Sequence, residues 1–219
     1  MKFTTVLALF PLLSTLAFGS PIEDHSIITD YPLEGYSITE PEWELEVYPN
    51  SNETIIARGT IEQAHDEARK VNPNWDAEVL EPALEIAKRS LESESPSEFA
   101  KRASNDFNLA ALDCGGRWEE VTWHDALRRT LYLHTVKGTP KNGPGPANCG
   151  RVSCAYDVAI WWCNDEPYTK WLDSFHVIAD GAMVVNNGCM KRNFGEADTT
   201  SGQAFHKANW NVIVRKDSC

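Results

Sequence analysis

Residues 151–164 read RVSCAYDVAIWWCN, the most strand-like stretch of this 219-residue chain. It is rich in β-branched and aromatic residues, which predicts one buried strand over about 152–163. Successive side chains in a strand point to opposite faces of the sheet. Cys154 and Cys163 should therefore face opposite ways and pair with different cysteines.

All the cysteines of the chain lie in the half that contains this strand. An even number of cysteines in a compact region predicts a closed set of disulfides in an oxidising compartment, with 15 possible connectivities for six of them. We therefore expect three bridges stapling one small domain. The six are Cys114, Cys149, Cys154, Cys163, Cys189 and Cys219.

Two helix patterns and one further strand surround the central stretch. Apolar residues recur at helical spacing over 119–134 and over 174–187, and apolar residues alternate with other residues over 210–215. The Gly- and Pro-rich run 137–148 predicts a loop. These elements predict an α+β fold: a small disulfide-stapled sandwich with two helices packed on one face of an antiparallel sheet.

The first 19 residues have the features of a secretory signal peptide. A basic residue, Lys2, precedes an apolar run, and small residues follow at Ala17 and Gly19. The apolar run is too short for a membrane span. We therefore expect a secreted, extracellular protein.

Residues 20–102 form a cysteine-free segment with 19 acidic and 7 basic residues, whereas residues 103–219 carry 13 and 12. This contrast predicts an acidic propeptide (20–102) and a mature cysteine-rich domain (103–219) with separate cores. The near-neutral domain gives no indication of a nucleic-acid partner.

Within this segment, the Pro-rich, acidic stretch 20–52 is expected to be extended or disordered. A capping box at Thr60 and Gln63 predicts a helix ending before Pro73, and a second helix is expected over about 76–91. Asn52 begins the only N-glycosylation sequon of the chain. The segment is thus expected to be partly disordered and partly helical.

Two dibasic pairs are candidate processing sites. Lys101 and Arg102 end the polar run 93–102, which is expected to be a flexible loop open to a protease. Lys88 and Arg89 fall inside the second expected helix, so this pair ranks lower. We therefore predict cleavage after Arg102 and a mature protein that begins at Ala103.

Histidines and tryptophans are the candidate functional residues of the cysteine-rich domain. His124 beside Asp125, or His206 with Glu196, could serve a hydrolase, but neither pair matches a known catalytic motif, and no catalytic residue is assigned. Metal-binding spacings are absent from the sequence, and we expect neither a metal nor a cofactor. Of the six tryptophans in the mature part, Trp118 and Trp171 are expected to be exposed and to serve surface recognition.

The patterns CGRVSCAYDVAIWWCN, FHVIADGAMVVNNGC and GQAFHKANWNVIVRKDSC resemble small secreted fungal proteins of the killer-toxin-like and necrosis-inducing effector type. The order of signal, acidic segment, Lys-Arg and cysteine-rich domain resembles fungal preproproteins cut by a kexin-type protease. The resemblance implies a compact α/β sandwich and a protein that binds a host or competitor protein, membrane or glycan target. A nuclease-like hydrolase using His124 or His206, and a cell-wall or carbohydrate-binding component, remain alternatives.

Overall fold

The computed structural model describes residues 36–219, except for the side chains of Leu91, Pro96 and Ala100. The expected signal peptide and the first part of the acidic segment lie outside these residues. The described chain is α+β, as expected, but it has five α-helices where four were predicted, two in the acidic segment and two on the sheet, and its main sheet is mixed.

The main sheet has six strands, with β8 and β12 at its centre and β7 on the other side of β8. All neighbours are antiparallel except β1, which runs parallel to β7. The prediction of a purely antiparallel sheet is therefore wrong. In spatial order the strands are β1 (Ser37–Ile38), β7 (Asn148–Ala155), β8 (Val158–Asn164), β12 (Trp210–Lys216), β11 (Gly202–His206) and β4 (Asp113–Cys114).

Three two-stranded pairs flank this sheet. One of them includes Lys141 and Asn142, within the run that was predicted to be only a loop. The pairs are β2 (Glu42–Glu46) with β3 (Thr54–Arg58), β5 (Val121–Thr122) with β10 (Thr199–Thr200), and β6 (Lys141–Asn142) with β9 (Lys170–Trp171).

The stretch predicted as one strand is a hairpin of β7 and β8. Tyr156 and Asp157 have left-handed backbone, with φ of 53° and 60°, so the chain reverses in two residues. A register shift between Arg151 and Ser153 marks a β-bulge in β7. As a result Cys154 and Cys163 lie in the same small cluster, not on opposite faces as predicted, although they do pair with different cysteines.

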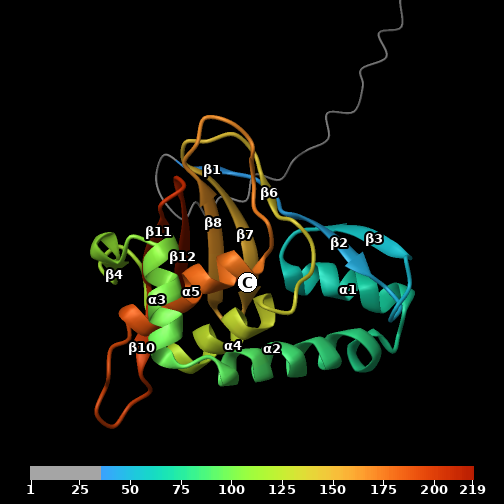
Figure 1. Cartoon of the computed structure of the whole chain (residues 1–219), viewed down its shortest axis with the longest axis horizontal. Coiled ribbons are helices and arrows are strands. Elements are labelled where there is room, and N and C mark those ends of the chain that lie inside the picture. Colours follow the sequence, from blue (N-terminus) through green and yellow to red (C-terminus); the bar gives the residue numbers. More distant parts are fainter. Residues whose placement is uncertain (1–35) are drawn as a thin grey trace, which may run out of the picture. The chain divides into compact units, whose positions relative to one another are not determined.

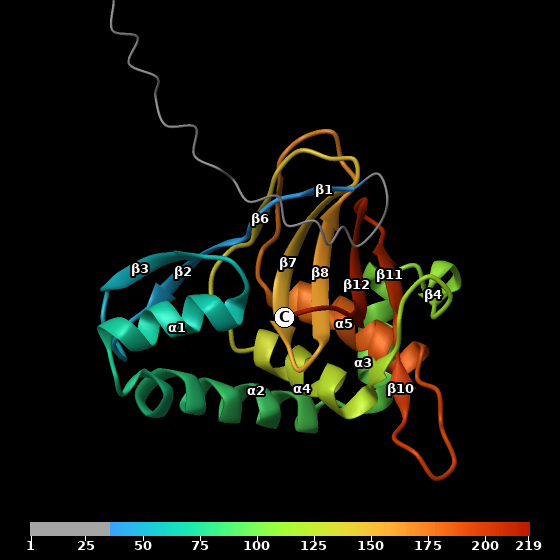
Figure 2. The same ribbon diagram turned by 180° about the vertical axis from the view of Figure 1, so that it is seen from behind.

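Helices α4 (Trp123–Leu133) and α5 (His176–Gly188) cover one face of the sheet, as Figures 1 and 2 show from opposite sides. α4 begins later than predicted because the Thr122 side chain caps it by accepting from the Asp125 amide. The expected apolar stripe of the second helix is buried. α5 approaches β12 closely at Gly181, where a Cβ would lie 2.6 Å from Val212 Cγ2.

The described part of the acidic segment, residues 36–102, is more ordered than predicted. It is called the first half below, and residues 103–219 are called the cysteine-rich half. Helix α1 (Ile61–Val71) begins with the expected Thr60–Gln63 capping box. The second expected helix appears as a π-helical turn, η1 (Asp76–Leu80), followed by α2 (Glu81–Ser93). Within 36–52, the stretch expected to be extended or disordered contains two strands, β1 and β2.

Helix α3 (Pro96–Asp106) occupies the run that was predicted to be a flexible loop, and the 3₁₀ turn η2 (Leu109–Ala111) follows it. A second capping box, formed by Ser95 and Glu98, explains the error, since Pro96 after an N-cap serine favours a helix start. The Lys101–Arg102 pair therefore lies in a helix.

One hydrophobic core contains residues of both halves, so the prediction of separate cores is wrong. The apolar residues of the first half are buried in the same cluster as those of the cysteine-rich half, which removes both sets from water. The shared core includes Trp43, Leu45, Ile61 and Ala64 from the first half and Val152, Trp162, Phe175, Ile178 and Val212 from the second.

All six cysteines form disulfides, as predicted. The Cys114–Cys189 bridge joins β4 to the end of α5, and Cys149–Cys163 joins β7 to β8 directly. Cys154–Cys219 fastens the C-terminal residue to β7, and Figure 2 shows the C-terminus on the side of the sheet opposite α4 and α5. The three bridges thus link strands of the sheet to each other, to the end of α5 and to the C-terminal residue.

Candidate functional site

The outer edge of β7 is covered by the first half of the chain. The Ser37 amide donates to the Ala147 carbonyl at 2.8 Å, and the Thr39 amide donates to the Cys149 carbonyl at 2.8 Å. These bonds add β1 as a short parallel strand to the edge of the sheet. The cysteine-rich half therefore has one long strand whose edge is closed by residues outside that half.

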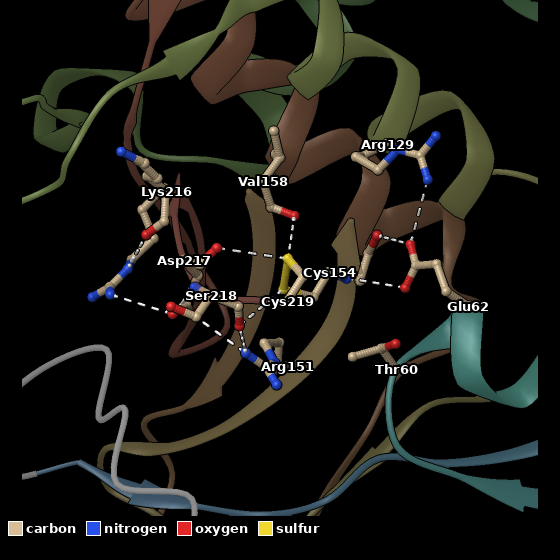
Figure 3. Close-up of a disulfide and its surroundings, with 12 residues drawn as sticks. Thr60, Glu62, Arg129, Arg151, Cys154, Val158, Lys216, Asp217, Ser218 and Cys219 are labelled. Atoms are coloured by element: carbon tan, nitrogen blue, oxygen red, sulfur yellow. Dashed lines mark hydrogen bonds and ion pairs between the residues drawn. A yellow bond between two sulfur atoms is a disulfide. The ribbon is translucent and has the colours of Figure 1, made fainter. Parts of the chain in front are cut away.

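Further along β7, the side chain of Glu62 in α1 covers the edge of the strand in place of β1. One of its carboxylate oxygens accepts from the Ser153 hydroxyl, and the other accepts from the Cys154 amide at 3.0 Å. Figure 3 shows Glu62 reaching β7 beside the Cys154–Cys219 bridge, with Arg129 of α4 on its other side. The Arg129 guanidinium lies 3.8 Å from Glu62, and both side chains are largely buried.

Apolar and aromatic contacts join the two halves behind this edge. The Trp43 ring stacks on Phe175 with centroids 4.5 Å apart, and its Nε1 donates to the Gly59 carbonyl at 2.7 Å. His65 of α1 is hydrogen-bonded to the Tyr132 hydroxyl of α4. Burial, and next the nearby Arg69 charge, lower the pKa of His65 to about 3. His65 is therefore neutral at physiological pH.

Arg102 joins the halves at a pocket of about 620 Å³ that is lined by residues of α2, of α5 and of the chain just after α4. Its Nε and Nη2 donate to the two oxygens of Glu94, at 3.0 and 2.9 Å, and its Nη1 donates to Asp180. His134 Nε2 lies 3.8 Å from the other Asp180 oxygen. Arg102 thus forms ion pairs with both the first half and the cysteine-rich half.

Burial dominates the electrostatics of this pocket. It raises the pKa of Asp180, although Arg102 opposes the rise, and it lowers the pKa of His134 to about 4, with help from His176 and Arg102. The Arg102 guanidinium is the main cause of the lowered pKa of Glu94. Burial thus disfavours the charged forms of both Asp180 and His134.

The dibasic pairs are ordered, contrary to the loop expected at 101–102. In α3 the Lys101 side chain is exposed while that of Arg102 is anchored; Lys88 and Arg89 are exposed on α2, the helix expected for them. A processing protease binds an extended chain, so cutting after Arg102 requires α3 to unwind locally. Cleavage itself stays a prediction.

Of the two tryptophans expected on the surface, only one is there. Trp118 is 2% exposed, with the Arg117 guanidinium over its ring, so the prediction of exposure is wrong. Trp171 is 61% exposed beside Lys141. Asn52 is exposed in the turn between β2 and β3, where a glycan would have room.

The two histidines considered for catalysis, His124 and His206, lie outside the contacts between the two halves. His124 is exposed on α4, against the edge of Trp123. His206 stacks on Trp210, and its Nδ1 accepts from the Ala208 amide. Neither has a hydrogen bond to Asp125 or Glu196 among the interactions found in residues 36–219.

Sequence reasoning missed the residues that join the halves. Glu62 was visible only as part of a helix start, and Ser37 lay in a stretch expected to be extended or disordered. The sequence offered one sign of the pocket at Arg102. His176 and Asp180 are four residues apart, which places both on one face of a helix. Their proximity to Arg102 depends on packing between helices far apart in the sequence.

None of the helices within residues 36–219 combines the length and apolar character that a membrane crossing needs. In that same part of the chain, His, Cys, Asp and Glu side chains nowhere gather in threes as a possible metal site. Comparison of the chain with protein-family models, curated proteins and solved structures finds no match in any of the three. Its function is therefore inferred from the geometry alone.

Proposed function

We propose that the chain is the precursor of a secreted, disulfide-stabilised effector or toxin-like protein that binds a host or competitor target. Its first half acts as a cover, which a kexin-type protease releases by cutting after Arg102. One observation carries this proposal. The cysteine-free segment that ends at Lys101–Arg102 covers the β7 edge and part of the α4–α5 face of the disulfide-bonded half.

Cutting after Arg102 changes the cover from a tethered segment into a separate molecule. While it is tethered, its effective concentration at the β7 edge is in the millimolar range or above. After the cut, only non-covalent contacts such as those of Trp43, Glu62 and Arg102 hold it. Dilution outside the cell then favours release, and the disulfides keep the remaining domain intact.

The position of the cut makes release conditional. Arg102 must leave both Glu94 and Asp180 before a protease can bind the chain in extended form. Premature cutting is therefore slowed, and the binding face stays covered during folding.

The test compares two matched variants of the full chain, Lys101→Gln and Lys88→Gln. Both lysines are exposed on helices, so neither change disturbs the core. With a kexin-type protease, we expect the Lys88→Gln chain to yield an N-terminus at Ala103 and the Lys101→Gln chain to stay intact. Binding of labelled protein to host or competitor cells should follow the cut. Secretion of an uncut, binding-competent chain contradicts the proposal.

A second candidate function, that of a cell-wall or carbohydrate-binding component, is favoured by one specific observation. The exposed ring of Trp171 has the Lys141 ammonium 5.1 Å from its centroid, and Tyr168, three positions earlier in the sequence, is also exposed. Aromatic rings flanked by polar groups bind sugar faces well. Pull-down on chitin and glucan, with Trp171→Ala as the variant and Tyr156→Ala as an exposed aromatic control, tests whether the target is a cell-wall component.

A further inference from the structure

The edge of β7 offers the backbone groups to which a new strand could be added. In the six-stranded sheet, β7 pairs with β8 on one side and only with the two residues of β1 on the other. An edge strand presents unpaired amide and carbonyl groups that template pairing with another chain. The Ala147 and Cys149 carbonyls are such groups, and β1 occupies them in the precursor.

The further end of the same edge is closed by a carboxylate instead of a strand. Glu62 accepts from the Cys154 amide and from the Ser153 hydroxyl, with Arg129 beside it. Without Glu62, the Cys154 amide would lose its partner, and Arg129 would have no carboxylate within ion-pair distance among the described residues. A buried arginine without a carboxylate partner is costly. This end of the edge therefore selects an acidic group.

Gly150, between these two ends, allows the occupant to come close. A Cβ at Gly150 would lie 3.2 Å from the Thr39 carbonyl oxygen and 3.2 Å from Pro41 Cγ. Gly150 is not among the residues with left-handed backbone, so no turn requires a glycine here. Its lack of a side chain serves the approach of a neighbouring chain.

We propose that the cleaved protein binds its target by strand addition at this edge, an inference that rests on the proposed release of the cover. An extended segment of a target protein takes the place of β1 along Ala147–Cys149. An acidic side chain of the same segment takes the place of Glu62 at Ser153 and Cys154. Because about 13 Å of strand separates Cys149 from Ser153, the acidic residue lies about four positions beyond the paired residues.

The experiment uses the full chain, cut after Arg102 with both pieces left together, and a labelled synthetic peptide of residues 36–63. Two versions of the peptide carry one N-methyl group on the backbone, at Thr39 or at Ile38. The Thr39 amide bonds to Cys149, whereas the Ile38 amide points away from β7, because amides alternate along a strand. Peptide exchange is measured by fluorescence anisotropy and gel filtration, with the uncut chain as control.

We expect the cut chain to take up the peptide and the uncut chain to exclude it. N-methylation of Thr39 should weaken binding at least about fivefold, and N-methylation of Ile38 by less than about twofold. A Gly150→Val chain should bind the unmodified peptide at least about fivefold more weakly. If that variant does not fold, the two methylated peptides still decide the matter.

Equal binding of the two methylated peptides would overturn strand addition. A cut chain that never exchanges its cover would also overturn it, while leaving cleavage after Arg102 established. A chain that the protease does not cut overturns the proposed function, and this inference with it. Denaturing electrophoresis identifies a chain that was not cut, and the anisotropy of the peptides with the cut chain separates the other two failures.

Discussion

Arg102 shows how one residue acquires a role that its neighbours in the sequence do not reveal. In the sequence it is half of a dibasic pair, and in the structure it holds carboxylates from α2 and α5 together. Because Glu94 belongs to the first half and Asp180 to the second, this one side chain joins them. The residue after which cleavage is proposed is thus held in a helix by two ion pairs.

Replacing Glu94 by Gln should speed cleavage after Arg102 by about fivefold, since a partly exposed ion pair contributes on the order of 1 kcal/mol. The rate is measured on the full chain with a kexin-type protease. Glu92→Gln, an exposed change on the same helix, is the control and should leave the rate unchanged. Equal rates for the two variants would show that the anchor does not limit unwinding of α3.

Trp43 provides a residue-level test of the shared core. Its side chain is 1% exposed, stacks on Phe175 and is hydrogen-bonded to Gly59. Trp43→Ala in the full chain should lower the free energy of unfolding by about 3–5 kcal/mol, as for other large-to-small core changes. Ile56→Ala, at a 62% exposed position of β3, should cost less than about 1 kcal/mol. Urea unfolding followed by circular dichroism separates the two; a small effect of Trp43→Ala would contradict a core shared by both halves.

At the scale of elements, local signals were reliable and turn signals were not. The Thr60–Gln63 capping box placed the start of α1 correctly because its hydrogen bonds are local. The equivalent box of Ser95 and Glu98 was overlooked among polar residues, which hid α3. The β7–β8 turn at Tyr156–Asp157 lacks glycine, so the hairpin looked like one strand. The pairing of β1 with β7 joins residues about 110 positions apart, beyond the reach of any local pattern.

The disulfides that link the elements should differ in how much they stabilise the fold. The Cys154–Cys219 bridge closes a separation of 65 residues, and Cys149–Cys163 closes one of 14. Loop entropy predicts stabilisation of about 4 and about 3 kcal/mol respectively. The double variant C154A/C219A should therefore unfold at lower urea concentration than C149A/C163A, which removes the same two sulfurs. The reverse order would show that direct cross-strand linkage matters more than loop length.

For the molecule as a whole, two buried histidines predict that acid destabilises the fold. The pKa of His65 is lowered to about 3 and that of His134 to about 4, against 6.5 for the ordinary side chain. The unfolded chain takes up these protons first, so stability is full above pH 6.5 and falls as the pH drops toward 4. At about 1.4 kcal/mol per pKa unit, the two can remove several kcal/mol. The raised pKa of Asp180 acts in the opposite direction, as a loss of stability with rising pH in the range above 3.8.

Both histidines lie between the halves: His65 against Tyr132 and Trp75, and His134 near Glu94, Arg102, His176 and Asp180. Mild acid should therefore loosen the cover. Urea unfolding of the full chain at pH 7.5, 6, 5 and 4 measures the slope, and His65→Phe should flatten it. His124→Phe, at an exposed position, is the control. An unchanged slope in His65→Phe would exclude His65 as a cause.

The sequence by itself determined the elements whose causes are local: the capped helix at Thr60, the buried apolar stripe of α5, the last strand and the even set of cysteines. It could not determine that the acidic first half belongs to the same core, because composition describes each segment alone while burial depends on what lies opposite. Only the tertiary structure placed Glu62 on Cys154 and Arg102 on Asp180. Those contacts join residues about 90 and 78 positions apart, and only the packing of the elements against one another brings them together.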